Sequence, residues 1–144
     1  MGDAAHGAHP ATPLHVLVAD DEPHIGRIIK MKLEQGPFVV TLAYDGAEAL
    51  AELERDPAIA LVLLDLMMPR LSGLDVLRQL RADARWATLP CIILTAAGQE
   101  QHHRTAIELG ASEFLTKPFS PKKLYARAAE LAGVSSEELG AGER

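Results

Sequence analysis

The chain has 144 residues, 48% hydrophobic and 24% charged, and a net charge of −6 at pH 7. This composition is typical of one globular domain. The acidic balance argues against nucleic acid as a partner, because phosphate backbones are bound by clustered Lys and Arg. The single cysteine excludes an internal disulfide, and no long apolar run or targeting signal opens the chain. We therefore expect a cytoplasmic protein without a membrane partner.

Five strand-like runs alternate with five helix-like segments from Leu14 onward. The runs are LHVLVA, FVVTLA, IALVLLD, PCIIL and SEFLT. The first, third and fourth are almost continuously apolar, as in strands covered by helices on both faces, whereas the mixed second and fifth suit sheet edges. The helix boundaries follow from capping residues, Pro and Gly: Pro23 to Gly36, Asp45 to Pro57, Ser72 onward, Gln99 to Gly110, and Ser120 to Gly133.

This alternation predicts an α/β fold of five βα units with right-handed crossovers. The expected architecture is a doubly wound, five-stranded parallel sheet in the order 2-1-3-4-5, which is flavodoxin-like. We expect the folded domain to span residues 14–132. Residues 1–13 contain no Lys or Arg and predict a flexible leader, and residues 133–144 predict a short acidic tail.

Five polar residues stand at or beside the carboxyl ends of the apolar runs: Asp20, Asp21, Asp65, Thr95 and Lys117. Because those ends lie along one edge of a parallel sheet, residues far apart in the sequence should meet there. Clustered carboxylates either acquire raised pKa values or bind a cation, and oxygen ligands favour Mg²⁺. The alternative for the adjacent acids is a cap on the helix that Pro23 opens.

The chemistry that this cluster supports is phosphoryl transfer onto a carboxylate. Asp65 is the expected nucleophile, because it ends an apolar strand and a carboxylate can form an acyl phosphate. Catalysis then consists mainly of alignment and charge neutralisation. We expect Lys117 to supply a positive charge and Thr95 a hydroxyl to the phosphoryl oxygens.

The site residues occur in four short motifs, Asp20-Asp21-Glu22, Asp65-Leu66-Met67-Met68-Pro69 with Gly73, Thr95-Ala96 and Lys117-Pro118-Phe119. In combination they resemble the receiver domain of two-component response regulators, from about Leu14 to Leu131. The resemblance implies that a histidine kinase or histidine phosphotransfer protein phosphorylates Asp65. It also implies Mg²⁺ held by the three aspartates and the backbone carbonyl of Met67, and a cis Lys117–Pro118 peptide bond.

The resemblance further implies a switch formed by Thr95 and Phe114. A hydroxyl drawn toward a new phosphoryl group leaves space that an aromatic ring can enter. Phe114 lacks the hydroxyl that could hold an outward rotamer, so we expect the inward state even without phosphate; the alternative is that Phe114 is simply core. The output surface would be the fourth helix, fifth strand and fifth helix, and would bind a downstream protein that the sequence does not identify.

Two residues bear on the lifetime of the acyl phosphate. In the family, the positions two beyond Asp65 and two beyond Thr95 flank the attacking water, and here they are Met67 and Ala97. Neither side chain offers a useful hydrogen bond to orient that water. The sequence therefore predicts slow intrinsic dephosphorylation.

Several alternatives remain open from sequence. The chain could be a single-domain regulator or a receiver excised from a larger regulator or hybrid kinase. An aspartate-nucleophile phosphohydrolase is disfavoured, because Met67 stands where such enzymes carry a second Asp, so we expect no enzyme beyond self-phosphorylation and dephosphorylation. Ile25, Ile28 and Ile29 could dock a kinase or belong to the core, and Cys91 should be inert core.

Overall fold

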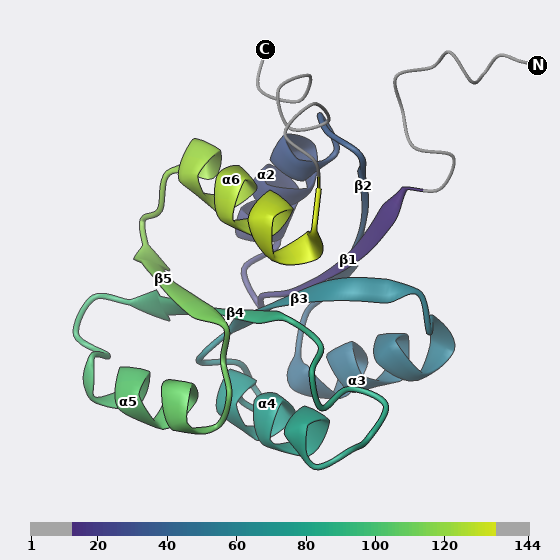
Figure 1. Cartoon of the computed structure of the whole chain (residues 1–144). Coiled ribbons are helices and arrows are strands. Elements are labelled where there is room, and N and C mark those ends of the chain that lie inside the picture. Colours follow the sequence, from purple (N-terminus) through teal and green to yellow (C-terminus); the bar gives the residue numbers. More distant parts are fainter. Residues whose placement is uncertain (1–12, 135–144) are drawn as a thin grey trace, which may run out of the picture.

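The computed structural model describes residues 13–134 as five parallel strands with helices on both faces (Figure 1). The strands are β1 (Leu14–Ala19), β2 (Phe38–Ala43), β3 (Ile59–Asp65), β4 (Cys91–Ala96) and β5 (Glu113–Lys117). The helices are α2 (Pro23–Leu33), α3 (Gly46–Arg55), α4 (Gly73–Arg81), α5 (Gln101–Glu108) and α6 (Pro121–Ala132). The sheet order is β2-β1-β3-β4-β5, which confirms the predicted fold and puts the two mixed strands at the edges.

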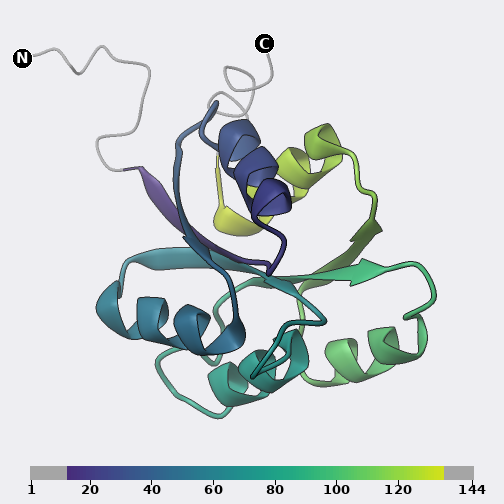
Figure 2. The ribbon, with the colours of Figure 1, turned by 180° about the vertical axis from the view of Figure 1, so that it is seen from behind.

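The helices divide between the two faces of the sheet. Helices α2 and α6 cover one face, and α3, α4 and α5 cover the other; the view from behind shows the same division (Figures 1 and 2). This arrangement follows from right-handed crossovers that change side where the chain returns to the middle of the sheet. No helix within residues 13–134 is both long enough and apolar enough to cross a membrane.

The helix boundaries follow the predicted capping residues closely. The Ser72 hydroxyl accepts the Asp75 N–H at 3.1 Å while the Asp75 carboxylate accepts the Ser72 N–H at 3.2 Å, so a reciprocal capping box opens α4. Helix α5 begins two residues later than predicted. The side chain of Gln99 accepts the Ala96 N–H at 2.7 Å and holds these residues in a turn.

Helix α6 ends with the C-cap Gly133, one residue before the last residue that the structure describes. Gly133 has φ of +80°, the left-handed conformation that commonly ends a helix, and Val134 N–H donates to Ala129 O at 2.9 Å. Gly133 and Val134 are the first residues of the predicted tail. The rest of that tail and the predicted leader up to residue 12 lie outside the described residues.

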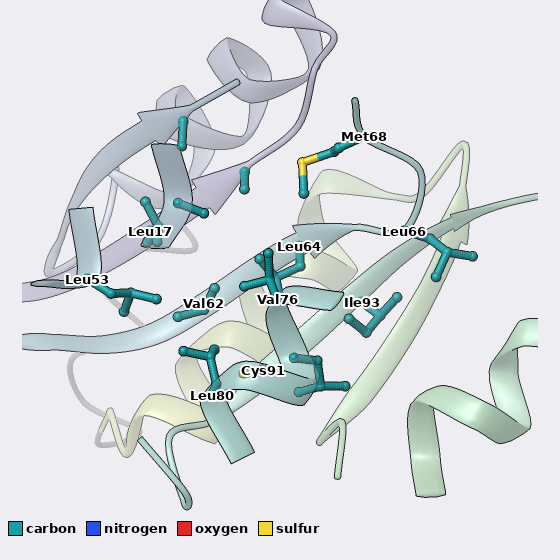
Figure 3. Close-up of a cluster of buried hydrophobic side chains, with 14 of the residues drawn as sticks. Leu17, Leu53, Val62, Leu64, Leu66, Met68, Val76, Leu80, Cys91 and Ile93 are labelled. Atoms are coloured by element: carbon teal, nitrogen blue, oxygen red, sulfur yellow. The ribbon is translucent and has the colours of Figure 1, made fainter. Parts of the chain in front are cut away.

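Two hydrophobic clusters hold the layers together, one on each face. Consecutive residues of β3 enter opposite clusters, since side chains alternate along a strand: Leu64 packs toward α3 and α4, and Leu63 toward α2 and α6. Figure 3 shows the first cluster, in which Val62 and Leu64 from the sheet meet Val76 and Leu80 of α4. The sheet is therefore a buried middle layer, as the apolar runs predicted.

The strand register brings the carboxyl ends of β1, β3, β4 and β5 to one level. Asp20 directly follows Ala19, which pairs with Leu64, so Asp20 and Asp65 are the next residues along adjacent strands. Three further pairs lie within two residues of this level: Asp65 with Leu94, Thr95 with Thr116, and Ala96 with Lys117. The predicted convergence of distant residues is thus a consequence of parallel pairing.

The core makes a direct prediction for stability. Leu64 is fully buried at the centre of the sheet. Leu64→Ala should lower the free energy of unfolding by about 3 kcal/mol, since it removes buried methyl groups and leaves a cavity. Urea unfolding measures the change. Met31→Ala is the control, because Met31 is 71% exposed on α2 and its loss should cost less than about 0.5 kcal/mol; equal losses for both variants would contradict the assigned core.

Candidate functional site

Three aspartates converge at the carboxyl edge of the sheet. Carboxylate oxygens of Asp20, Asp21 and Asp65 all lie within 4.8 Å of one another. Asp20 and Asp65 are buried, whereas Asp21 is exposed to solvent. The loop after β1 is held by the Glu22 N–H, which donates to Asp20 Oδ1 at 2.9 Å. The sequence prediction that these acids meet at one place is therefore confirmed.

The acids do not serve as a helix cap. The N-cap residue of α2 is Glu22, and no side-chain hydrogen bond caps this end of the helix. Pro23 occupies the first turn, where its missing N–H costs nothing. The carboxylates of Asp20 and Asp21 are left for the cluster, and the capping alternative raised from the sequence is wrong.

Lys117 reaches into the same cluster from the end of β5. Its Nζ lies 2.8 Å from Asp20 Oδ2 and 3.4 Å from both Asp65 Oδ2 and Glu22 Oε1. Burial acts to lower the pKa of Lys117, but its contact with Asp20 and the charge of Asp65 outweigh burial and raise that pKa above its ordinary value. The ammonium therefore stays charged at neutral pH. The Lys117–Pro118 peptide bond is cis, as the family resemblance implied.

Asp65 carries the strongest electrostatic perturbation in the cluster. Burial at the strand end, followed by the charge of Asp20, raises the pKa of Asp65 to about 7, although Lys117 acts in the opposite direction. The ionised form of Asp65 is therefore unfavourable, and an added positive charge would stabilise it. The site is thus poised to favour a cation.

The donor set fits a hard divalent metal ion. It consists of carboxylate oxygens, the ligands that Mg²⁺ favours, and the exposed Asp21 leaves one side of the cluster open to solvent. Asp20 Oδ2 is buried, and the Lys117 ammonium faces it at 2.8 Å as an ion pair. The Met67 side chain is 56% exposed, and a metal role for its carbonyl stays a prediction.

Thr95 lies at this edge but turns away from the acids. Its hydroxyl is buried and lies 3.2 Å from His103 Nε2 on α5, and 3.4 Å from the Thr116 hydroxyl. No hydrogen bond described for residues 13–134 joins Thr95 to Asp65 or Lys117. The strand register therefore places Thr95 near the acidic cluster, but its side chain contacts His103 and Thr116 instead.

The Phe114 ring packs against α5. It is partly buried against the cluster beneath β4, and its ring stacks on His103 with centroids 3.8 Å apart and planes tilted by 33°. This position agrees both with a packing role and with a ring already inside. Its part in a switch stays a prediction.

Gly73 fixes the backbone around the acid. Its N–H donates to Leu66 O at 2.9 Å, and a Cβ added there would stand 2.4 Å from the carbonyl oxygen of Asp65. Only glycine lets the first turn of α4 approach the end of β3 this closely. The Gly73 of the sequence motif thus supports the position of Asp65.

Comparison with known proteins agrees with this geometry. The family model of the response regulator receiver domain matches residues 16–129. The chain belongs to the response regulator receiver family. Receiver domains are signalling switches of two-component systems, in which they interact with histidine kinases, and they are generally not enzymes.

Curated relatives of this receiver domain are longer proteins. It is 38% identical over 128 residues to the alkaline phosphatase synthesis transcriptional regulatory protein PhoP of Bacillus subtilis, with 85% of this chain and 52% of that protein covered. It is 40% identical over 112 residues to the transcriptional regulatory protein CpxR of Klebsiella pneumoniae, with 78% and 46% covered. The chain therefore spans about half the length of the curated relatives it matches.

Solved structures of receiver domains match nearly end to end. The receiver domain of the Francisella response regulator 1452 has a TM-score of 0.75 and 36% identity, covering 83% of this chain and 97% of that one. The chemotaxis response regulator CheY4 of Vibrio cholerae has a TM-score of 0.77 and 26% identity, covering 83% and 99%. The fold and the domain type are thus shared.

Sequence reasoning about this receiver domain left two contacts unforeseen. Glu22 joins the cluster through Lys117, although it had been noted only as part of a motif. His103 links Thr95 to Phe114, and its only sequence signal is its position on the helix that follows Thr95. Both contacts depend on side-chain direction, which residue spacing does not specify.

Two open questions about side chains receive answers. Ile29 is fully buried, Ile25 packs at the edge of the core, and Ile28 is 45% exposed on α2. The three isoleucines therefore divide between core and surface. Cys91 is fully buried, and burial raises the pKa of its thiol to about 11, so the prediction of an inert cysteine is confirmed.

The raised pKa of Asp65 predicts that the stability of the folded protein depends on pH. Because the pKa of Asp65 is about 7 in the folded protein, higher than its ordinary value of 3.8, the folded state binds the proton more tightly. The stability of the metal-free receiver domain should fall as pH rises from about 4 to about 7. Asp65→Asn removes the charge and should stabilise the protein at pH 8 by on the order of 3 kcal/mol, and much less at pH 4.

Chemical unfolding in EDTA across this pH range measures both proteins. Added Mg²⁺ should raise the unfolding midpoint of the wild type at pH 8 much more than that of Asp65→Asn. If the stability of the two proteins depended on pH in the same way, Asp65 would not be the carboxylate with the raised pKa.

Proposed function

We propose that this receiver domain is a phosphorylatable switch, in which Asp65 accepts a phosphoryl group from a phosphohistidine of a histidine kinase or a histidine phosphotransfer protein. The observation that supports this most directly is the convergence of three aspartates within 4.8 Å, with the Lys117 ammonium 3.4 Å from Asp65. A buried carboxylate of raised pKa beside a fixed positive charge suits a nucleophile whose negative charge passes to a phosphoryl group.

A carboxylate oxygen of Asp65 attacks phosphorus, and the P–N bond to the phosphohistidine breaks. The freed ring nitrogen keeps the electron pair, and because the other ring nitrogen carries a proton, the leaving group is neutral imidazole. Lys117 stabilises the charge on the phosphoryl oxygens, and the Thr95 hydroxyl donates to one of them after its side chain turns. Mg²⁺, held by Asp20, Asp21 and Asp65 with the Met67 carbonyl, would neutralise charge on both reacting groups.

The surface beside Lys117 suits the docking of the phosphoryl donor. A hollow of about 190 Å³ lies between α2 and the start of α6, lined by apolar side chains and the stem of Lys117. Its lining is formed by Ile25, Ile28, Lys117, Pro118, Phe119 and Pro121. An apolar side chain of a helical donor protein could occupy it while the phosphohistidine faces Asp65. The half-exposed Ile28 then contributes to partner binding.

The proposed response appears on the surface formed by α5, β5 and α6, where a downstream protein would bind. The contacts of Thr95 on β4 and Phe114 on β5 with His103 of α5 support this surface. Relatives such as PhoP and CpxR are named as transcriptional regulators, and CheY4 as a chemotaxis response regulator. A single-domain regulator and the receiver part of a longer protein would use the site in the same way.

The decisive experiment is phosphorylation by a small donor. With Mg²⁺ and acetyl phosphate, the wild type should gain one phosphoryl group by intact-mass spectrometry, and Asp65→Asn should gain none. Asp83→Asn is the control and should gain one phosphoryl group like the wild type, because Asp83 lies beyond the carboxyl end of α4 and pairs with Arg85. EDTA should abolish the gain in the wild type and in Asp83→Asn.

Two outcomes would contradict the proposal. Phosphorylation of Asp65→Asn to the wild-type extent would place the acceptor elsewhere. Sustained multiple-turnover hydrolysis of a generic phosphomonoester would instead support the phosphohydrolase alternative.

We also propose that the phosphorylated form is long-lived, because the exposed Met67 and Ala97 offer no hydrogen bond to the attacking water. Met67→Asn should accelerate loss of the phosphoryl group about tenfold, since an amide can orient that water. Mass spectrometry after removal of the donor measures the rate. Met31→Asn, an exposed methionine on α2, should leave the rate at the wild-type value; equal rates in all three proteins would refute the idea.

A further inference from the structure

We propose that His103 is a positioning residue that holds the Thr95 hydroxyl toward α5 and must release it when Asp65 is phosphorylated. The inference rests on the proposed function and extends it to a residue outside the four motifs. It makes His103 the physical link between the phosphoryl site and α5, one of the helices of the proposed output surface.

The alternation of side chains separates the two groups. Leu63 and Leu115 belong to the cluster under α2 and α6, so Asp65 and Lys117, two residues further along the same strands, begin on that side of the sheet. Ile93 belongs to the opposite cluster, which puts Thr95 on the side of α5. The hydroxyl therefore starts on the wrong side of the sheet to meet a phosphoryl group and must turn to reach it.

His103 engages both partners of the predicted switch at once. Its Nε2 lies 3.2 Å from the Thr95 hydroxyl, and its ring stacks on Phe114 at a centroid distance of 3.8 Å. The Thr116 hydroxyl lies 3.4 Å from Thr95 and is the longer contact. The same imidazole ring forms the hydrogen bond to Thr95 and the stack on Phe114. Loss of the hydrogen bond therefore removes a restraint on the stacked ring.

Competition for one proton provides the mechanism. A threonine hydroxyl has a single hydrogen to donate. The Thr116 hydroxyl at 3.4 Å can accept it, and so can the nearer His103 Nε2 at 3.2 Å when the other nitrogen of a neutral imidazole carries the proton. A phosphoryl oxygen is charged and forms the stronger hydrogen bond. Phosphorylation would thus withdraw the donated hydrogen from His103 and leave the imidazole without this partner.

Helix α5 is the element that such a release would affect most. Among its eight residues only Ala106 is fully buried, and its N-cap Glu100 makes no side-chain cap hydrogen bond. A helix with so little buried surface is held weakly, so one side-chain hydrogen bond and one ring stack are a substantial part of its attachment. His103 is therefore placed where a small change at Thr95 can alter the surface.

The test measures binding of beryllofluoride, a mimic of the phosphoryl group, in the presence of Mg²⁺. His103→Phe keeps an aromatic ring against Phe114 but cannot accept the hydroxyl, so it should bind the mimic about fivefold more tightly, the effect of one hydrogen bond that no longer has to be broken. His102→Phe, the adjacent histidine on α5, should match the wild type, since no described hydrogen bond or ring contact joins it to Thr95 or Phe114.

A double-mutant cycle separates this role from simple packing. In a Thr95→Val background the hydroxyl is absent, so His103→Phe should no longer change the affinity. NMR of the wild type provides a second measurement without any variant. On addition of beryllofluoride, the imidazole ¹⁵N resonances of His103 should shift, and those of His102 should shift much less.

The outcomes distinguish the inference from the function on which it rests. If the wild type binds beryllofluoride but His103→Phe has unchanged affinity, or if its effect persists without the Thr95 hydroxyl, the inference is wrong and the proposed function stands. Unchanged His103 resonances in the bound wild type would lead to the same conclusion. If the wild type does not bind the mimic at Asp65, the proposed function fails and the inference with it.

Discussion

The burial of the Asp65 carboxylate, beside the charge of Asp20, is the constraint around which this site is organised. Two buried carboxylates at adjacent strand ends are unfavourable, and the Lys117 ammonium relieves only part of the cost, as the raised pKa of Asp65 indicates. Such a cluster gains from every added positive charge. A divalent cation is therefore a favourable occupant, and it would offset the negative charge that a phosphoryl group brings to the proposed site.

The sheet holds these repelling carboxylates in a fixed geometry. Parallel pairing aligns strands from distant parts of the chain to the same level, and helices on both faces exclude water from the strand interiors. Gly73 lets α4 close against the end of β3, which holds Asp65 at the rim. The core thus contributes to chemistry by keeping acidic groups together that would separate on a looser scaffold.

The two faces of the sheet have different tasks in this arrangement. The α2 and α6 side carries Asp65 and Lys117, with an apolar hollow next to them that suits a phosphoryl donor. The α5 side carries Thr95 in contact with His103, which stacks on Phe114. In the proposed switch, Thr95 is the residue whose side chain passes from one side to the other, and this makes it the natural point of coupling between input and output.

The amino-acid sequence alone determined the strand order, most helix boundaries apart from the start of α5, and the meeting of three aspartates with Lys117, because hydrophobic periodicity and parallel pairing depend on local pattern. Only the tertiary structure decided that Lys117 contacts Asp20 more closely than Asp65, and that Thr95 bonds to His103. These contacts depend on helix rotation and side-chain rotamers, which are set by packing between elements. Residue spacing therefore identified the three aspartates, Lys117 and Thr95 as site residues, and packing between elements determined which side chains they contact.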